Sequence, residues 1–398
     1  MRAGVRCGAA CSESLLAGCG RRYNDGMETP PWSSRSSDGT LSCPVAAACG
    51  GCPEGGRSLG EQAFAKRQLI EQSLEAACTT PGLLWARNAS RGVQFVHSPE
   101  PLGYRGRIRM RIDEAGELAF FNQKKALPCP VLASSVADGL RTLTSFAARS
   151  EGAFAEFAHV EIRAADLEGR PSAYLVPRDT GRPPSPPAAE AIAELRTSWY
   201  VEVDGSGTMH SGQRYPLFGS WWYVPLGAFM QINAGVNELL VQHAVAGATA
   251  RSASTFADLF SGCGNFALPL SAAGFQGVAV ERDPRGSRAA RATAAARAIE
   301  GLSCLTADAS RWAEDTVRRG ARFDLVLLDP PRAGLKEHAG AFADLVARHA
   351  LLHSCSTQSL ARDLRHLTKA GLRVESVTAF DMFPHTGHVE AAVWLCRE

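Results

Sequence analysis

The stretch Ala350-Leu-Leu-His-Ser-Cys-Ser-Thr-Gln-Ser359 joins an apolar run to a short polar cluster and then to a helical pattern. The apolar run predicts a buried strand, and the pattern over residues 358–367 predicts a helix that follows it at once. A strand that leads directly into a helix is the repeating unit of a parallel, doubly wound sheet. Cys355 would then lie at the carboxyl end of its strand, where such sheets place their reactive crevice.

Cys355 is a candidate nucleophile because of this position. A helix that begins just after a thiol is expected to lower the thiol pKa through its dipole. The alternative is a structural role, since free cysteines commonly pack as small apolar side chains. Position alone does not decide between the two, so the rest of the chain has to.

The alternation of strand and helix extends over the whole chain from residue 255 onward. Helices are predicted over 283–299 and 357–368, and the last two strands are joined by a loop without a helix. The predicted strands are 256–260, 277–281, 303–306, 323–328, 350–353, 372–380 and 391–396. This pattern predicts an α/β fold with a mostly parallel sheet, whose final strand is antiparallel.

A glycine turn follows the first of these strands, in Asp258-Leu-Phe-Ser-Gly-Cys-Gly-Asn-Phe266. Glycines let a cofactor approach the backbone closely, but the third glycine of a dinucleotide fingerprint is missing. Glu281 ends the second strand, where a carboxylate can bind ribose hydroxyls, and Asp308 follows the third, within reach of an adenine amino group. The set predicts S-adenosylmethionine rather than a nicotinamide cofactor.

Two further carboxylates come at strand ends. Asp329 ends the fourth strand before Pro330, Pro331 and Arg332. Methyltransferases that act on exocyclic nitrogens generally have an aromatic residue after such a proline pair, so Arg332 argues against that target. Glu390 leads into an apolar strand, which is costly unless the carboxylate has a partner or a function.

The first third of the chain contains three closely spaced thiols, in Cys43-Pro-Val-Ala-Ala-Ala-Cys49-Gly-Gly-Cys52. Cys129, between two prolines, is the best candidate for a fourth ligand. Four thiolates suit either zinc or an iron–sulfur cluster, and spacing alone does not choose between them. A redox pair is the alternative.

A run of arginines marks a strand over residues 104–112. Arg105, Arg107, Arg109 and Arg111 alternate with Tyr104, Ile108, Met110 and Ile112, so four guanidiniums lie on one face. Such a face can bind the phosphates of RNA. The alternative is an ordinary solvated strand face.

Composition limits the class of protein. The chain has 42 Lys and Arg against 40 Asp and Glu, a net charge of +2, so RNA binding would depend on local patches. Neither a membrane-spanning run nor a secretory signal is recognised, which predicts a cytoplasmic protein. Residues 1–42 are expected to be a disordered tail, with Met27 as a second possible start. A β-rich central domain is expected over 43–225, with a helix over 59–77 that packs on the catalytic domain, 226–398.

Six ordered motifs together resemble the RNA uracil-5-methyltransferase family. They are Cys-x5-Cys-Gly-Gly-Cys with a distant Cys-Pro, Phe-x-Gln-x-Asn, Asp-Leu-Phe-x-Gly-x-Gly-Asn-Phe, Asp-Pro-Pro-Arg-x-Gly-Leu, Ser-Cys-x4-Leu-x-Arg-Asp-Leu and Asp-Met-Phe-Pro-His-Thr-Gly-His-x-Glu. The resemblance implies that Cys355 is the nucleophile and Glu390 the base. The residues that it places around S-adenosylmethionine are Gln231, Phe260, Asn265, Glu281, Asp308 and Asp329. The ligands that it implies for a [4Fe–4S] cluster are Cys43, Cys49, Cys52 and Cys129.

The resemblance also implies a Rossmann-like methyltransferase domain beside an iron–sulfur domain, acting as a monomer on carbon 5 of a uridine. A cluster is found in the members that act on rRNA and is generally absent from bacterial members specific for tRNA, so 23S rRNA is the expected substrate. The alternatives are a tRNA enzyme, an inactive RNA-binding protein and an iron–sulfur sensor. Ser356 and Thr357 depart from the family, which usually has Asn-Pro there, and Gly106 stands where Asn is usual.

Overall fold

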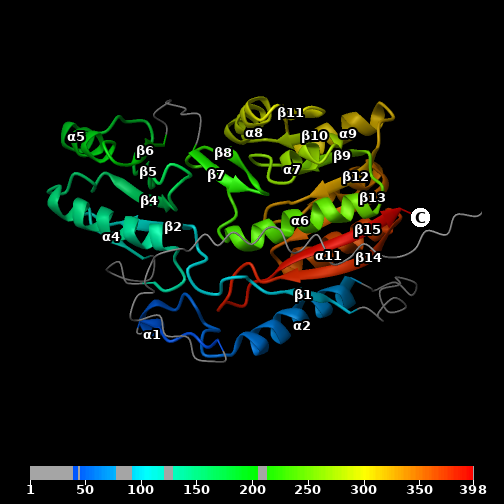
Figure 1. Ribbon diagram of the computed structural model, residues 1–398, viewed down its shortest axis with the longest axis horizontal. Coiled ribbons are helices and arrows are strands. Elements are labelled where there is room, and N and C mark those ends of the chain that lie inside the picture. Colours follow the sequence, from blue (N-terminus) through cyan, green and yellow to red (C-terminus); the bar gives the residue numbers. More distant parts are fainter. Residues whose placement is uncertain (1–38, 44, 78–91, 121–128, 205–212, 398) are drawn as a thin grey trace, which may run out of the picture.

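The computed structural model describes residues 39–397 apart from 44, 78–91, 121–128 and 205–212. The expected tail therefore lies outside the described residues as far as residue 38. Leu41, within the expected tail, donates its amide hydrogen to the Gly55 carbonyl at 2.8 Å. A large sheet, a smaller sheet with its own helices and a hairpin between them make up the described chain (Figure 1).

The larger sheet has eight strands and covers most of the sequence after residue 255. Its strands are β1 Gln94–Val96, β9 Thr255–Leu259, β10 Gln276–Glu281, β11 Leu302–Thr306, β12 Phe323–Leu328, β13 Val346–Ser354, β14 Leu372–Phe380 and β15 Glu390–Arg397. Their order is β1-β14-β15-β13-β12-β9-β10-β11. All neighbours pair in parallel except β15, which lies antiparallel between β13 and β14, as predicted.

Helices cover both faces of this sheet, which makes it doubly wound. One face packs against α2 Leu59–Ala77, α9 Ala309–Arg318, α10 Ala339–Asp344 (after the short η2 Lys336–His338) and α11 Thr357–Lys369. The other face packs against α6 Ala234–Ala250, α7 Ala267–Ala272, α8 Pro284–Ala296 and the hairpin of β7 Gln213–Leu217 and β8 Ser220–Val224.

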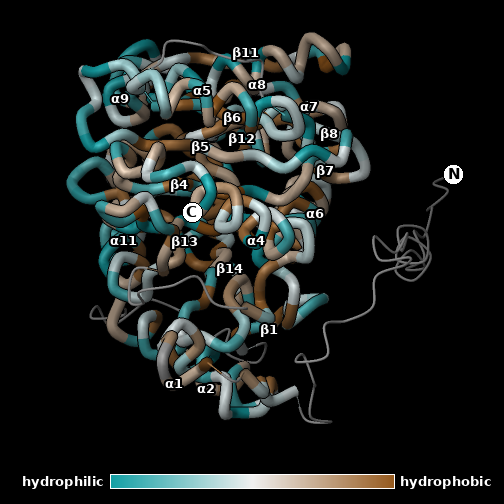
Figure 2. Tube along the Cα trace, turned by 90° about the vertical axis from the view of Figure 1, so that its left-hand side faces the viewer, coloured by the Kyte–Doolittle hydropathy of each residue, from teal (hydrophilic) through white to brown (hydrophobic). Residues whose placement is uncertain are grey.

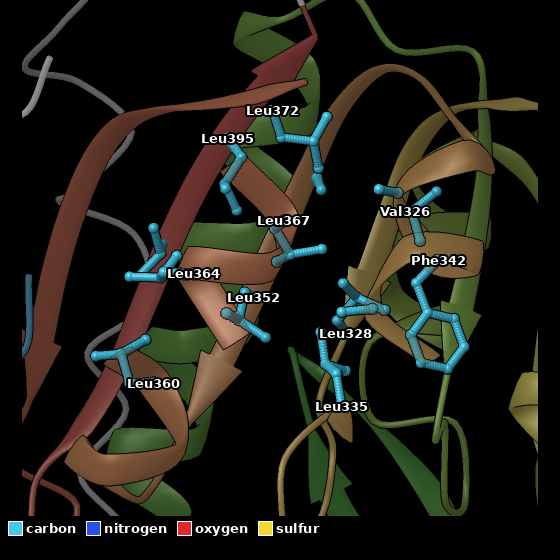
Figure 3. Packing of buried hydrophobic residues seen from close by; sticks show 14 of the residues in the cluster. Val326, Leu328, Leu335, Phe342, Leu352, Leu360, Leu364, Leu367, Leu372 and Leu395 are labelled. Atoms are coloured by element: carbon cyan, nitrogen blue, oxygen red, sulfur yellow. The ribbon is translucent and has the colours of Figure 1, made fainter. Parts of the chain in front are cut away.

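Helix α11 shows why this sequence forms a helix at this place. Leu360, Leu364 and Leu367 recur at helical spacing, are fully buried and pack against the sheet with Leu352 and Leu395 (Figure 3). Full burial of one leucine contributes about 2 kcal/mol. The Ser356 side chain caps the helix by accepting from the Ser359 amide, so α11 begins directly after Cys355.

The smaller sheet has five strands, in the order β3-β2-β4-β5-β6. Its strands are β2 Arg107–Ile112, β3 Leu118–Ala119, β4 Phe157–Arg163, β5 Ser172–Pro177 and β6 Tyr200–Val203. One face packs against two helices that are not predicted from the sequence, α4 Ser134–Arg149 and α5 Pro186–Leu195. In Figure 2 the hydrophobic segments gather in the interior and the hydrophilic ones lie toward the outer helices.

The segment that contains α2 and β1 joins the larger sheet although it precedes the smaller one in sequence. α2 packs against α11, as expected for the helix over 59–77, and β1 pairs in parallel with β14 (Figure 1). β1 is not predicted from the sequence. Among the described residues, no helix is both long and apolar enough to cross a membrane.

Candidate active site

Strand pairing brings Cys355 and Glu390 to neighbouring positions of the larger sheet. In the antiparallel pair β13–β15, Ser354 pairs with Ala391, so the next position on each strand is Cys355 and Glu390. Cys355 is half-buried in the turn before α11, and Glu390 is buried as the first residue of β15. The two candidate catalytic groups, 35 residues apart in sequence, are therefore adjacent at one end of the sheet.

Asp329 extends this group from the neighbouring strand. Leu327 of β12 pairs with Leu351 of β13, and both belong to the core on the α6 side of the sheet. Side chains alternate between the faces of a strand, so Asp329 and Cys355 are on that same side. Glu390 is as well, because Ala392 belongs to the same core.

The two carboxylates of this group do not ionise independently. Burial raises the pKa of Asp329 to about 7. Burial and, after it, the nearby Asp329 carboxylate raise the pKa of Glu390 well above its ordinary value. Two buried carboxyl groups in such proximity tend to hold one proton between them. A carboxylate whose pKa is raised in this way is a strong base once it has lost its proton.

The pKa of Cys355 corrects one expectation from the sequence. The helix that begins after this thiol was expected to lower its pKa, but the pKa is raised. Burial is the main cause and the Glu390 carboxylate the next; Arg332 acts in the opposite direction without reversing the shift. The thiol is therefore protonated at neutral pH, and its proton must leave before it can attack a substrate.

A second carboxylate-rich region lies at the ends of β9 and β10. Asp258 is fully buried, and its Oδ2 accepts from the Ala267 amide at 3.0 Å. Burial and Asp329 raise its pKa well above the ordinary value. Its Oδ1 is buried and has no hydrogen-bond partner among the described residues. Such an orphan oxygen beside Asp329 indicates that a proton or a ligand is held here.

The turn after β9 has the backbone geometry of a close ligand approach. Phe260 has a φ of 65°, which is strained for a residue with a side chain, and Gly262 and Gly264 have φ of 55° and 88°. Glu281 supports this turn: its two carboxylate oxygens accept from the Gly262 amide at 2.9 Å and the Asp283 amide at 2.7 Å. Glu281, predicted to bind ribose, is thus held against the glycine turn.

The remaining predicted cofactor residues lie around the same edge. Asp308 caps α9, and its Oδ1 accepts from the Ser310 and Arg311 amides. Asn265 forms a reciprocal amide pair with Asn237 of α6, with both bonds at 2.8 Å, so its side chain fixes the turn to that helix. Gln231 is half-buried just before α6.

The four candidate metal ligands come from separate segments of the chain. Cys43 and Cys49 flank and end the short helix α1 Ala46–Cys49, Cys52 follows it, and Cys129 comes from beyond β3. Burial raises the pKa of Cys52 to about 12, and the thiols of Cys129, Cys49 and Cys43 contribute in that order. Within the described ranges, however, no three His, Cys, Asp or Glu side chains form a group that could hold one metal ion.

The arginine strand is β2, and its alternation is confirmed. Ile108, Met110 and Ile112 are buried against α4, while Arg109 and Arg111 are exposed on the opposite face. Arg105, Arg107 and Arg109 also bond within the protein, Arg109 to His159, so the free arginine face is narrower than predicted. Arg107 bonds to Glu161 at 3.2 Å and lies 5.6 Å from the centre of the Phe229 ring, which is 61% exposed, and Arg105 bonds to the Arg107 carbonyl.

Comparison with known proteins shows the family of this chain. The profile of the family described as tRNA (Uracil-5-)-methyltransferase matches residues 221–398. The 23S rRNA (uracil(1939)-C(5))-methyltransferase RlmD of Klebsiella pneumoniae strain 342 is 31% identical over 375 residues, which cover 88% of this chain and 80% of that protein. The chain belongs to the RNA uracil-5-methyltransferase family. It is a methyltransferase that uses S-adenosylmethionine, and the resemblance seen in its motifs is confirmed.

Other relatives of this methyltransferase agree. RlmD of Pseudomonas fluorescens strain Pf0-1 is 30% identical over 372 residues, which cover 88% of this chain and 77% of that protein. The tRNA (uracil-54, C5)-methyltransferase of Pyrococcus abyssi, solved with S-adenosyl-L-homocysteine, superposes with a TM-score of 0.64 at 20% identity. The superposition covers 89% of this chain and 87% of that chain. Because the identity is low, this similarity supports the fold alone.

Two buried charged groups of this methyltransferase, Asp258 and Lys66, are not among the predicted site residues. Asp258 was recognised only as part of the glycine motif, although it is a buried carboxylate beside Asp329. Lys66 was not recognised at all; it is buried and paired with Asp381 at 2.5 Å. A lysine on the apolar side of the predicted helix was the one signal that could have found it.

Proposed function

We propose that this methyltransferase transfers a methyl group to carbon 5 of a uridine in 23S rRNA through a covalent bond between Cys355 and carbon 6. The observation that carries the proposal is the strand register that puts Cys355 beside Glu390, with Asp329 on the same side of the sheet. The curated relatives with matching length are named as 23S rRNA enzymes, which favours rRNA over tRNA. The cytoplasm, where ribosomal subunits are built, would be its location.

The chemistry requires a nucleophile because carbon 5 of uracil is itself poorly nucleophilic. The Cys355 thiolate adds to carbon 6, and the electron pair of the 5,6 double bond moves to form an enolate. Carbon 5 then takes the methyl group from the sulfonium of S-adenosylmethionine, which leaves as the neutral thioether. The uracil has to leave its stack to reach the thiol, and a single-stranded segment allows this most easily.

Glu390 completes the reaction. After methyl transfer, carbon 5 still bears its proton, and the Glu390 carboxylate removes it. The electron pair of that bond restores the 5,6 double bond, and the carbon–sulfur bond breaks to release Cys355 as a thiolate. Asp329, which raises the pKa of Glu390, strengthens this base.

The methyl donor would lie along the ends of β9 to β12. Glu281 would bind the ribose hydroxyls and Asp308 the adenine, while Gln231, Phe260, Asn265 and Asp329 would line the remainder. The positive φ angles from Phe260 to Gly264 fit a ligand that lies against the backbone. Bound S-adenosylmethionine would supply an electrophilic methyl group. The residues of the chain would orient this methyl group toward Asp329 and Cys355.

The four thiols of the central part, 43–225, are proposed to hold a [4Fe–4S] cluster. After burial, the thiols of Cys129, Cys49 and Cys43 raise the pKa of Cys52, which indicates that they lie near it, and bound iron would stabilise the Cys52 thiolate. Each thiolate of such a cluster binds a different iron, so the ligands lie farther apart than those of one zinc ion. Once bound, the cluster would tie Cys129 to the segment from Cys43 to Cys52.

Substitution of one ligand tests the cluster. We expect Cys52→Ser to reduce bound iron and sulfide to below about half of the unmodified protein's content, since a three-thiolate site holds a cluster weakly. Cys304→Ser is the matched control, because Cys304 is buried on β11. Iron and acid-labile sulfide are measured after anaerobic reconstitution; stoichiometric zinc without sulfide would contradict the proposal.

The exposed part of the arginine strand is proposed to bind the RNA backbone. Arg109 and Arg111 are exposed, and the strand is connected to the catalytic part through the Gly106 amide, which donates to the Ile232 carbonyl at 2.7 Å. Ile232 follows Gln231 directly. RNA held on β2 would therefore lie next to the cofactor edge.

We expect the double variant Arg109→Ala, Arg111→Ala to weaken RNA binding and its salt dependence. For each phosphate that the variant no longer neutralises, the slope of log K against log salt should fall by about 0.7 for single-stranded RNA. The control is Arg141→Ala, Arg318→Ala: Arg141 is exposed on α4, which covers the opposite face of the smaller sheet from Arg109 and Arg111, and Arg318 is exposed on α9 of the larger sheet. Binding is measured by filter retention at several salt concentrations; equal slopes in both variants would contradict the assignment.

The pH dependence of adduct formation follows from the raised pKa of Cys355. Since only the thiolate attacks, the single-turnover rate should rise with pH through neutrality and beyond the ordinary thiol pKa of about 8.5. Glu390→Gln removes one of the charges that raise this pKa, so its profile should shift to lower pH. Rapid quenching of labelled RNA gives the rate, and a profile that is flat from about pH 6 to 9 would contradict a protonated thiol.

The RNA substrate is tested by incubating the protein with labelled S-adenosylmethionine and unmodified transcripts. We expect 5-methyluridine in 23S rRNA and background amounts in tRNA, measured by chromatography of the digested nucleosides. Methylation of tRNA alone would contradict the choice of RNA. If neither RNA gains 5-methyluridine while the cluster is intact, an inactive RNA-binding protein or a sensor becomes the better description.

A further inference from the structure

The loop of residues 381–389 joins β14 to β15 and ends directly at Glu390. Much of it is interior: Asp381, Met382, His385 and Val389 are buried. His385 has a φ of 66°, left-handed backbone that is strained for a residue with a side chain. Such a conformation persists only where the surroundings fix it.

Lys66 of α2 binds this loop at two points. Its Nζ donates to Asp381 Oδ1 at 2.5 Å and to the Phe383 carbonyl at 2.9 Å. The lysine is 1% exposed and Asp381 is 3% exposed, so the ion pair is sealed from water. Two of the three donors of one ammonium are therefore bound to the segment that leads to Glu390.

Other contacts hold the same loop from the amino-terminal side. Gln62, one turn before Lys66, accepts from the His385 amide at 2.8 Å and lies 3.4 Å from its Nδ1. The Tyr104 hydroxyl donates to the Pro384 carbonyl at 3.1 Å. The buried side of α2 thus presents two polar side chains, Gln62 and Lys66, to the loop, although the buried side of such a helix would ordinarily be apolar.

A buried ion pair is weak evidence for a stabilising role. Removal of two charges from water costs about as much as their attraction returns, and a well-packed apolar pair often stabilises as well or better. The Lys66–Asp381 pair instead makes the conformation of the loop specific, because the ammonium fixes one conformation through two hydrogen bonds of defined geometry.

We infer that Lys66 is a positioning residue, which holds the loop 381–389 so that the Glu390 carboxylate meets the proton on carbon 5. The inference rests on the proposed role of Glu390 as the base. It predicts that loss of Lys66 affects proton removal more than the two steps before it, because Cys355 lies in the turn between β13 and α11, outside this loop.

The test separates these steps in a single turnover. RNA with tritium at carbon 5 of uridine reports proton removal, and S-adenosylmethionine with a labelled methyl reports methyl transfer. For Lys66→Met we expect tritium release to slow by about 10- to 100-fold, as a small misplacement of a catalytic group does. Methyl transfer should change much less, so a methylated adduct that resists denaturation accumulates.

Two further variants distinguish a loss of positioning from a loss of folding stability. Lys66→Met leaves Asp381 buried without its partner, so the double variant Lys66→Met, Asp381→Asn removes both charges and should recover thermal stability while tritium release stays slow. Arg251→Met is the control, because Arg251 pairs with Glu375 at the other end of β14 and touches no part of the loop.

Three outcomes would overturn the inference. One is normal tritium release in the double variant. Another is that methyl transfer and tritium release slow equally in Lys66→Met, and that both rates recover in the double variant together with its thermal stability. The third is an Arg251→Met protein that accumulates adduct as Lys66→Met does. The proposed function is checked separately: if the unmodified protein methylates RNA and Glu390→Gln traps an adduct, only the role of Lys66 has failed.

Discussion

Cys355→Ala is expected to abolish methyl transfer, with a loss of at least about a thousand-fold in single-turnover rate, since in the proposed mechanism the Cys355 thiolate activates carbon 5. Carbon 5 of uracil does not attack a sulfonium unaided, and within the described chain Cys355 is the thiol that lies beside Glu390 in the sheet register. The rate is measured with labelled S-adenosylmethionine and excess enzyme over RNA. RNA binding, measured separately, should change little, because the thiol is not part of the arginine face.

Cys304→Ala is the control for this prediction. Cys304 is buried on β11, away from Glu390, so its loss should leave methyl transfer within a few-fold of the unmodified protein. Residual activity of Cys355→Ala at a tenth or more of the unmodified rate would show that another residue is the nucleophile.

Glu390→Gln has the opposite signature: turnover is lost but the covalent adduct accumulates. Removal of a general base lowers the rate by about 10²- to 10⁴-fold. Addition of the thiolate and methyl transfer both precede the step that needs Glu390, so the protein is expected to stop as a methylated adduct. The measurement is the fraction of labelled RNA that migrates with the protein on a denaturing gel.

Glu375→Gln is the matched control, since Glu375 lies on β14 and pairs with Arg251 rather than with a group of the site. It should turn over and leave no trapped RNA. A Glu390→Gln protein that neither turns over nor traps RNA would place the carboxylate before, not after, methyl transfer.

The fold could be predicted from the sequence wherever strands are long and apolar. The seven strands from β9 to β15 carry their signal locally, in runs bounded by glycine, proline or a helix cap. β1 has three residues and becomes a strand only because β14 offers it an edge, so nothing within residues 94–96 reveals it. The helices α4 and α5 are not predicted from the sequence, and each lies between two short strands of the smaller sheet.

The residues of the site could be predicted, but their ionisation could not. Cys355, Asp329 and Glu390 each lie within two residues of the end of a predicted strand, which is enough to bring them to one edge of the sheet. The pKa of Cys355 depends instead on burial and on a carboxylate from another strand, and these outweigh the local helix end. Lys66 is 315 residues from Asp381, so their ion pair exists only in the folded chain.

The central claim is a covalent bond between Cys355 and carbon 6 of a methylated uracil. The most direct measurement is mass spectrometry of the adduct trapped by Glu390→Gln, after digestion with nuclease and protease. We expect a peptide that contains Cys355 and carries one nucleotide whose uracil has gained a methyl group. A nucleotide attached to a different residue, or a trapped uracil without the methyl group, would contradict it.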